Sequence, residues 1–139
     1  MAGSDAADPQ TGAVGIATVT SRRSVSATVE RLLAILAERG LTTVVVIDHS
    51  GAAREAGIAM PDTKVVVFGS PLAGSPLMLA APSLALDLPL RILVAAGGDG
   101  VTRVSYTDGD YLASRHRLDG SLAGPLRALT GVVEALVVD

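Results

Sequence analysis

The sequence contains two histidines, His49 and His116, and they are its strongest candidates for acid–base chemistry near neutral pH. A cleft that joined both imidazoles with Tyr106 and a serine, Ser70 or Ser75, could transfer protons or bind a small molecule. We therefore take these five residues as a candidate binding site near the two histidines. The competing interpretation, and the more common role of an isolated histidine, is that each imidazole hydrogen-bonds backbone where the chain turns.

Residues 69–78 contain a short echo, Gly-Ser-Pro-Leu-Ala followed by Gly-Ser-Pro-Leu-Met. Glycines and hydroxyls that lead into a helix N-terminus can hold an anion. Ordinary capping explains the same residues more simply, because serine followed by proline is a usual helix start. The two histidines are 67 positions apart and lack the ligand spacing of a metal site. We expect no metal and no cofactor.

The composition excludes several classes of function. Eleven basic and fourteen acidic residues give a net charge of −3, and aromatic residues are few, so we expect no nucleic-acid partner. The absence of cysteine excludes disulfides and thiolate chemistry. The first residues lack a basic and apolar signal segment, and Asp87 and Arg91 interrupt the apolar stretch 76–96. We therefore expect a cytoplasmic protein with no membrane partner.

Apolar spacing predicts two long amphipathic helices, which would have to position these side chains. The first stripe consists of Val25, Val29, Leu32 and Leu36. Gly40 follows it and can close that helix. The second stripe, near the C-terminus, consists of Leu122, Leu126, Leu129, Val133 and Leu136. Pro125 fits this second helix only in its first turn, where a backbone N–H is not needed.

Runs rich in β-branched residues predict five strands, at 14–20, 41–48, 63–68, 90–95 and 101–106. Short helical segments are expected at 52–56, 75–81 and 111–117. A glycine-rich connection joins the last two strands, which is typical of a hairpin. The expected fold class is α+β: a two-layer sandwich whose mixed, mainly antiparallel sheet of about five strands is covered by two long helices plus short ones. Residues 1–12 are expected to be a disordered tail, and 13–139 a single domain.

Several short motifs, taken together and in this order, resemble the domain-of-unknown-function family numbered 302. They lie at residues 47–49, 68–71, 74–78, 85–91 and 106–116, and the resemblance extends from about Ala13 to Leu118. It implies a compact two-layer α/β fold related in shape to one half of the TATA-binding protein, without implying DNA binding. The family has no assigned activity. This chain has Ser70 and Ser75 where the family commonly has asparagine and threonine.

The sequence is compatible with three classes of function. We favour a small soluble domain that binds a small molecule or acts as an accessory protein, with a pocket near the two histidines. The first alternative is an enzyme that uses the same histidine, tyrosine and serine side chains in acid–base chemistry. The second is a protein-interaction module that forms a homodimer through an exposed apolar strand or helix face.

Overall fold

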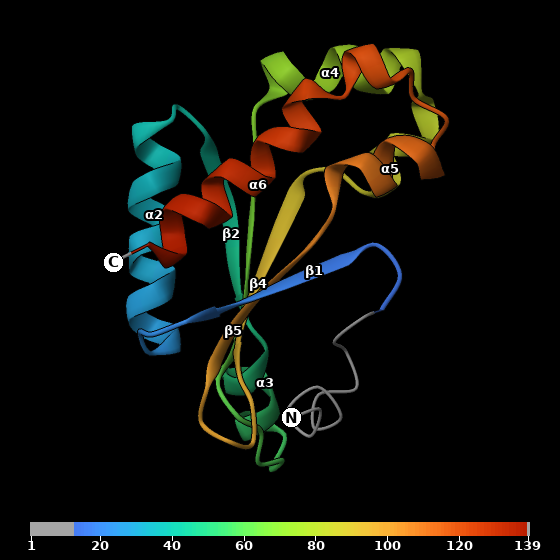
Figure 1. The fold of residues 1–139 in the computed structure, drawn as a ribbon. Helices are drawn as coiled ribbons and strands as arrows, with labels where there is room; N and C mark the ends of the chain where they lie inside the picture. The colour runs from blue at the N-terminus through green and yellow to red at the C-terminus, as the bar shows by residue number, and fades with distance from the viewer. Residues whose placement is uncertain (1–12, 139) are drawn as a thin grey trace.

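The computed structural model describes residues 13–138, so the expected tail at 1–12 lies outside the described residues. One layer is a five-stranded sheet, and the two long helices α2 and α6 form the second layer (Figure 1). The strands are β1 (Ile16–Ser21), β2 (Thr42–Asp48), β3 (Thr63–Gly69), β4 (Leu90–Ala96) and β5 (Thr102–Thr107). The helices are α2 (Val25–Glu38), α3 (His49–Glu55), α4 (Pro71–Ala80), α5 (Gly109–Arg115) and α6 (Gly124–Val137), with 3₁₀ helices η1 (Pro82–Leu86) and η2 (Gly120–Leu122).

The strand order is β1-β5-β4-β3-β2, and every pairing between neighbours in this order is antiparallel. Thr42 of β2 pairs with Gly69 of β3, whereas Asp48 pairs with Lys64. The sheet therefore has two distinct ends, which we call the Gly69 end and the Asp48 end. Helices α4 and α5 follow strands that finish at the Gly69 end, and α3 follows the strand that finishes at the Asp48 end. The expected α+β fold class is confirmed.

Helix α2 forms where the apolar stripe predicted it. The Ser24 hydroxyl caps its N-terminus by accepting a hydrogen bond from the Ala27 backbone N–H at 3.1 Å. Gly40, with φ of +72°, turns the chain after its last residues. The buried stripe of α2 packs with that of α6 against the sheet. This main cluster comprises Val25, Val29, Leu32, Ile35, Leu36, Val66, Phe68, Ile92, Val94, Val104, Tyr106, Leu129, Val132, Val133 and Leu136.

A second cluster of buried side chains lies at the Gly69 end, next to the main cluster, and Leu90 packs against both. It is built from short elements, α4, η1 and α5, together with the first turn of α6 and the turns before it. Its members are Leu77, Ala81, Leu84, Leu112, Ala113, Leu118, Ala123 and Leu126. Pro125 lies in the first turn of α6, as predicted, so its missing N–H costs no helical hydrogen bond.

Helix α4 begins earlier than predicted, and the expected start at Ser75 is wrong. Ser70 is the N-cap and Pro71 the first helical residue, because the first copy of the Gly-Ser-Pro echo supplies the same cap-and-proline signal. Pro76 consequently lies inside the helix, where it removes one backbone hydrogen bond. The expected turn at 52–56 is likewise placed too late, since α3 starts at His49 under a cap from the Asp48 side chain.

Candidate functional site: an apolar groove between α4 and α6

A partly enclosed groove of about 560 Å³ lies at the Gly69 end of the sheet. Helices α4 and α6 form two of its walls, and the start of β2 forms a third. The end of β3 and the segment before β4 form the remaining side. Its lining residues are Leu41, Thr42, Val44, Phe68, Gly69, Ser70, Pro71, Ala73, Gly74, Ser75, Leu77, Met78, Leu88, Pro89, Leu90, Pro125, Leu126, Ala128, Leu129 and Val132. This volume falls within the range of about 300–1,000 Å³ that small-molecule sites occupy.

The groove is apolar, with a few hydroxyl groups. No charged side chain lines it, and its polar side chains are those of Thr42, Ser70 and Ser75. Burying a charge without a partner costs far more than burying a hydroxyl that can form one hydrogen bond. The lining therefore suits an uncharged, largely apolar molecule that carries at most a few polar atoms.

The groove lies where the two hydrophobic clusters meet. Phe68, Leu129 and Val132 belong to the main cluster, whereas Leu77 and Leu126 belong to the second. Helix α4 contributes residues between 71 and 78 to the lining and α6 residues between 125 and 132, and the gap left between the two helices is the groove. Its walls are thus positioned by two separately packed units.

Both serines predicted as site residues line this groove. The Ser70 side chain accepts a hydrogen bond from the Ala73 backbone N–H at 3.4 Å, so capping, one of the two interpretations of the serine-proline echo, applies at Ser70. Ser75 lies in the middle of α4 and is exposed. The structure therefore brings Ser70 and Ser75 together in one site.

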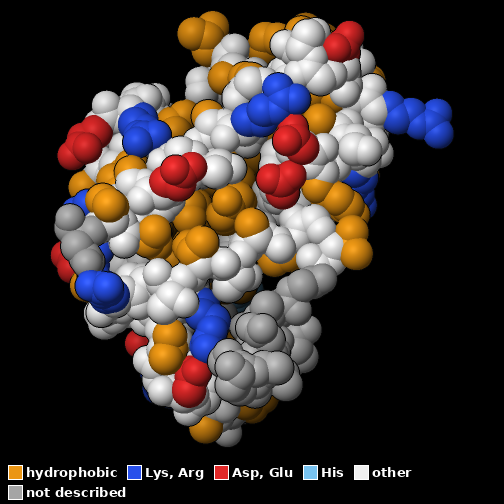
Figure 2. All heavy atoms as spheres, in the orientation of Figure 1, with side chains coloured by type: hydrophobic (Ala, Val, Ile, Leu, Met, Phe, Trp, Pro, Cys, Tyr) orange, Lys and Arg blue, Asp and Glu red, His pale blue; other side chains and the backbone are white. Residues whose placement is uncertain are grey.

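Helix α4 exposes apolar side chains on its outer surface as well. Leu72 and Leu79 are 89% and 85% exposed, and the helix contains no charged residue. Figure 2 shows hydrophobic side chains standing over α4 at the top of the molecule. A helix that is apolar on every side is normally covered, so the outer wall of the groove is an unusual surface for a small domain.

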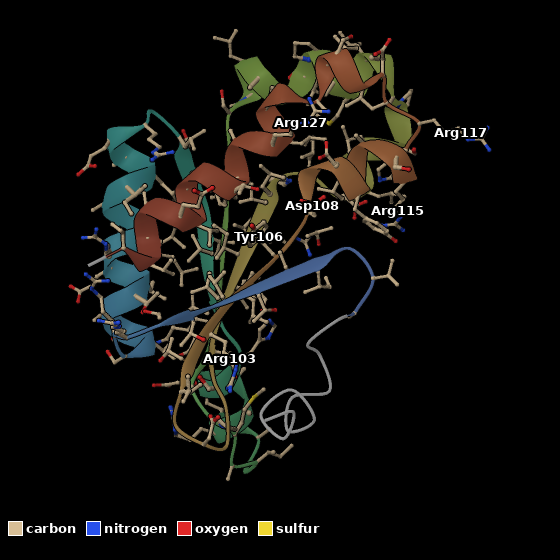
Figure 3. All side chains as sticks on the ribbon, in the orientation of Figure 1. Arg103, Tyr106, Asp108, Arg115, Arg117 and Arg127 are labelled. Atoms are coloured by element: carbon tan, nitrogen blue, oxygen red, sulfur yellow. The ribbon has the colours of Figure 1, made fainter. Side chains whose placement is uncertain are left out.

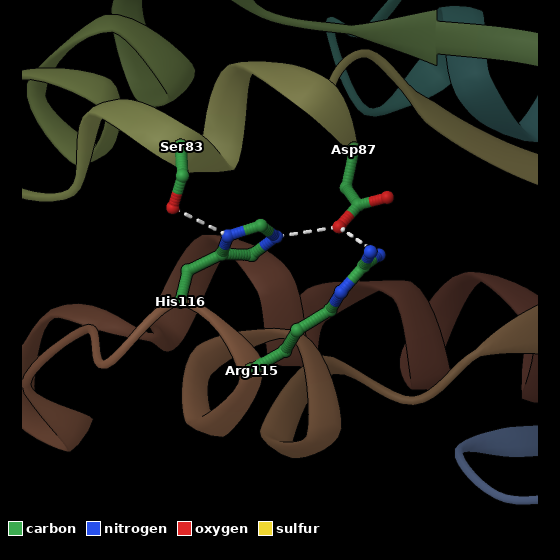
Figure 4. A network of polar contacts seen from close by, with 4 residues as sticks. All are labelled: Ser83, Asp87, Arg115 and His116. Carbon is green, nitrogen blue, oxygen red and sulfur yellow. Dashed lines mark hydrogen bonds and ion pairs between the residues drawn. The ribbon is translucent and has the colours of Figure 1, made fainter.

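His116 does not face the groove but forms a separate polar network at the end of α5 (Figure 4). Its ring is 4% exposed, and Nε2 lies 2.5 Å from an Asp87 carboxylate oxygen while Nδ1 lies 2.7 Å from the Ser83 hydroxyl. Because a carboxylate can only accept, Nε2–H donates to Asp87, and in the neutral ring Nδ1 accepts from Ser83. Arg115 also donates to Asp87, at 2.8 Å. We call these four residues the His116 network.

The His116 network joins η1 to α5. Ser83 and Asp87 lie in and directly after η1, and Arg115 and His116 end α5. Leu84, which lies between Ser83 and Asp87, is fully buried in the second cluster, and Leu112 of α5 is buried in the same cluster. The network therefore holds the two short elements that close the second cluster. Arg117, the residue after His116, points away from the molecule (Figure 3).

His49 lies at the Asp48 end of the sheet, opposite the end that carries Ser70 and His116. Its neighbour Asp48 pairs with Lys64 at the start of β3, while Ser70 follows the last residue of that strand. The side chain of His49 is exposed. The expectation that both histidines share one cleft is therefore wrong, because strand direction carries residue 48 and residue 70 to opposite ends of the sheet.

The Asp48 carboxylate, next to His49 in the sequence, caps helix α3. Asp48 accepts hydrogen bonds from the Gly51 backbone N–H at 2.9 Å and the Ser50 hydroxyl at 2.8 Å, and so caps α3. The Gly51 hydrogen bond, followed by that of Ser50, lowers the pKa of Asp48 below its usual value. Asp48 and His49 together form a helix start rather than an acid–base pair.

Tyr106, the remaining predicted site residue, is 9% exposed and belongs to the main cluster. Figure 3 shows it between the sheet and α6. It lines neither the groove nor a smaller cavity of about 140 Å³ that includes Asp87 and Arg91. Because side chains alternate along a strand, Tyr106 shares with Val104 the face of β5 that the helices cover, and both side chains belong to the core.

Sequence reasoning missed most of the groove. Leu88, Pro89 and Ala128 gave no chemical signal, because apolar residues in a short segment or a helix are expected to pack in the core. Ser83 and Asp87 were also missed as partners of His116. Their spacing of four residues, on either side of the three apolar residues 84–86, was the one available hint that both could face the same way.

Among residues 13–138, no group of three or more His, Asp or Glu side chains could hold a metal ion. None of the helices in that range has the length and apolar character needed to cross a bilayer.

The fold and the groove define a two-layer α+β domain with an apolar site at one end of its sheet. A family model described as "Domain of unknown function DUF302" matches residues 17–136, and the chain belongs to this family. The crystal structure of an uncharacterized conserved protein DUF302 from Bacillus stearothermophilus is similar, with a TM-score of 0.75 and 17% sequence identity. The match covers 90% of this chain and 97% of that one, and the resemblance found in the motifs is confirmed.

Two longer proteins are also similar to this chain. The "Fluoride-specific ion channel FluC 1" of Brucella suis biovar 1 (strain 1330) is 37% identical over 122 residues, covering 86% of this chain and 48% of that protein. The protein of the same name from Brucella abortus biovar 1 (strain 9-941) is 37% identical over 122 residues, covering 86% and 45%. The chain thus spans about half the length of the curated relatives it matches.

Proposed function

We propose that this chain is a ligand-binding accessory domain that takes an uncharged, largely apolar small molecule in the groove between α4 and α6. The observation that carries the proposal is the lining: a volume of about 560 Å³ with three hydroxyl side chains and no charge. Sites for small molecules usually combine apolar walls with a few polar groups that fix orientation. Thr42, Ser70 and Ser75 would take that orienting role.

The accessory part of the proposal draws on the two Brucella relatives, whose names describe ion channels. The stretch similar to this chain makes up about half of each. Ion pathways are lined by rings of carbonyl groups or charged side chains, or by narrow apolar constrictions. A groove that ends against a packed sheet has none of these features. We therefore propose that the corresponding half of those proteins binds a ligand and does not conduct the ion.

The test is a titration with N-phenyl-1-naphthylamine, an uncharged apolar dye that fluoresces in apolar surroundings. Ala128 lines the groove from α6 and is exposed, so Ala128→Phe fills the groove without disturbing the core. Ala34→Phe on α2 is the matched control, because Ala34 is equally an exposed alanine on a 14-residue helix and lies outside the groove.

We expect the unmodified chain and Ala34→Phe to bind the dye alike, and Ala128→Phe to bind at least about tenfold more weakly, a loss of about 1.4 kcal/mol. Equal binding by all three proteins would overturn the groove as the site. A charged analogue, 8-anilinonaphthalene-1-sulfonate, should bind more weakly than the uncharged dye, since the groove offers its sulfonate no cation.

A second candidate function is ester hydrolysis at Ser83, and the His116 network is the observation that favours it. Ser83, His116 and Asp87 form a hydrogen-bonded chain of the three residue types used by serine hydrolases, although Asp87 meets Nε2 and Ser83 meets Nδ1. Ser83 is exposed, so a substrate could reach its hydroxyl. His116 would take the Ser83 proton while the oxygen attacks the ester carbonyl, and would then give that proton to the alcohol as the ester C–O bond breaks. Water, losing a proton to His116, would attack the acyl-serine, and His116 would return that proton to Ser83 as the carboxylic acid leaves.

This second candidate is tested with p-nitrophenyl butyrate. Hydrolysis that is lost in both Ser83→Ala and His116→Ala, but kept in Ser121→Ala, would support it. Ser121 is a suitable control because it is likewise an exposed serine in a 3₁₀ helix, but its hydroxyl bonds the Asp119 carboxylate and no histidine. Hydrolysis by Ser83→Ala at the same rate as by the unmodified chain would exclude Ser83 as the nucleophile.

A further inference from the structure

Strand β2 is an outer strand of the sheet and is unusually apolar for that position. It pairs with β3 on one side, and the strand order leaves its other side without a partner strand among residues 13–138. Val44, Val45 and Ile47 are 60%, 45% and 38% exposed. No charged residue occurs in β2 before Asp48, whose carboxylate is engaged in capping α3.

Natural proteins protect such edges, because an unpaired row of N–H and C=O groups invites another strand. The usual protections are charges, prolines or bulges. The register of β2 shifts between Thr43 and Val45, so a bulge at Val44 interrupts the first part of the edge. Residues 45–48 beyond the bulge keep a regular register with β3 and carry no protecting charge until Asp48.

We propose that β2 pairs antiparallel with β2 of a second copy of this chain, which forms a homodimer with one continuous ten-stranded sheet. The twofold axis passes near Val46, beyond the bulge. Val45 of each copy then faces Ile47 of the other, on the sheet surface opposite the helices. This inference does not rest on the ligand proposed above.

The charge pattern favours a second copy as the occupant. With the axis at Val46, Asp48 of each copy faces Val44 of the other. The two Asp48 carboxylates are then four strand positions apart, roughly 14 Å at about 3.4 Å per residue. Exposed charges at that distance are largely screened, since the screening length is about 8 Å at physiological salt. The residues on either side of the axis, Val45 and Ile47, are thus apolar against apolar, Asp48 faces an apolar residue, and no like charges are opposed.

The size of the contact predicts its strength. Stable interfaces bury roughly 1,200–2,000 Å², and a pair of short strands buries less. We therefore expect a dimer that dissociates between about 1 µM and about 1 mM, where free energies of association run from about −8 to about −4 kcal/mol.

The experiment is analytical ultracentrifugation of the full chain across that concentration range. The mass should rise from 14.0 kDa toward about twice that value. Val45→Lys/Ile47→Lys places two lysines opposite two others in the proposed register, so it should stay at 14.0 kDa throughout. The matched control is Ile16→Lys/Thr20→Lys on the other outer strand, since Ile16 is 37% exposed against 38% for Ile47. This control should dimerise like the unmodified chain.

A chain that stays monomeric up to about 1 mM overturns the proposal. So does a dimer that persists in the β2 variant or disappears in the β1 control. If the β2 variant does not fold, amide hydrogen exchange of the unmodified chain tests the dimer instead. Amides of β2 must then exchange more slowly as the concentration rises, while those of β1 stay unchanged. Concentration-independent exchange in both strands contradicts the dimer.

Discussion

The main cluster and the second cluster reach similar burial by different means. In the main cluster, two 14-residue helices each lay one apolar stripe on the sheet, and Leu32, Leu36 and Leu136 have no exposed surface. In the second, Leu84 is just as buried, but the elements around it are short and two of them are joined by the polar His116 network. Hydrogen bonds join elements around both clusters, since Arg31 of α2 donates to the Ala135 and Leu136 carbonyls of α6. The difference is that two periodic 14-residue helices close the main cluster, whereas several short elements close the second.

The groove follows from this difference. Two units that pack separately do not fill the space where they meet, and side chains from both form the groove walls. Leu90 contacts both clusters and lines the groove as well. A change in the second cluster should therefore affect the groove more than an equally buried change at the far end of the main cluster.

The largest effect is expected from shortening a side chain in the main cluster. Leu36→Ala should lower the free energy of unfolding by about 2–5 kcal/mol, the usual cost of a cavity at a fully buried leucine. Urea denaturation followed by circular dichroism measures this change. A loss below about 0.5 kcal/mol, the level of a surface substitution, would show that α2 does not pack as described.

The His116 network should contribute less. His116→Ala removes a buried ring with two hydrogen bonds, and we expect a loss of about 1–3 kcal/mol in the free energy of unfolding. His49→Ala is the matched control, because His49 is exposed at the other end of the sheet, and it should change stability by less than about 0.5 kcal/mol. Equal losses in the free energy of unfolding for the two variants would contradict a stabilising role that His116 has and His49 lacks.

The smallest effect concerns acid stability at the hairpin between β4 and β5. Hydrogen bonds from Arg103, followed by that of the Val101 backbone N–H, lower the pKa of Asp99 from 3.8 to about 2. A lowered pKa stabilises the fold above pH 3.8, and this contribution is lost as the pH falls toward about 2. The melting temperature of Asp99→Asn should therefore be lower than that of the unmodified chain at pH 6. The difference between the two melting temperatures should disappear near pH 2. A difference in melting temperature that does not change with pH would contradict the lowered pKa of Asp99.

The sequence predicted the main cluster well and the second poorly, for a physical reason. Val25, Val29, Leu32 and Leu36 recur at helical spacing, and such periodicity over 14 residues has one simple interpretation. Residues 69–90 are apolar almost throughout, so no stripe distinguishes a buried face, and η1 was not predicted at all. The hairpin between β4 and β5 was predicted because its glycines constrain the turn.

The candidate site was predicted only in part. Ser70 and Ser75 lie in the groove, because a helix that starts after β3 must cross the Gly69 end of the sheet. His49 and His116 could not be placed relative to each other, since that depends on strand directions across the whole sheet. The apolar groove walls have no local signature, because leucines around a cavity look like leucines in a core.

The most direct test of the central claim is a titration of the uniformly ¹⁵N-labelled chain with 1-decanol, an uncharged apolar ligand with one hydroxyl, followed by amide chemical shifts. Binding in the groove predicts saturable shifts at residues 69–78 and 125–132, with the amides of residues 48–55 at the Asp48 end unchanged. Shifts centred on residues 48–55, or no saturable shifts anywhere, would contradict the claim that the junction of the two clusters is a ligand site.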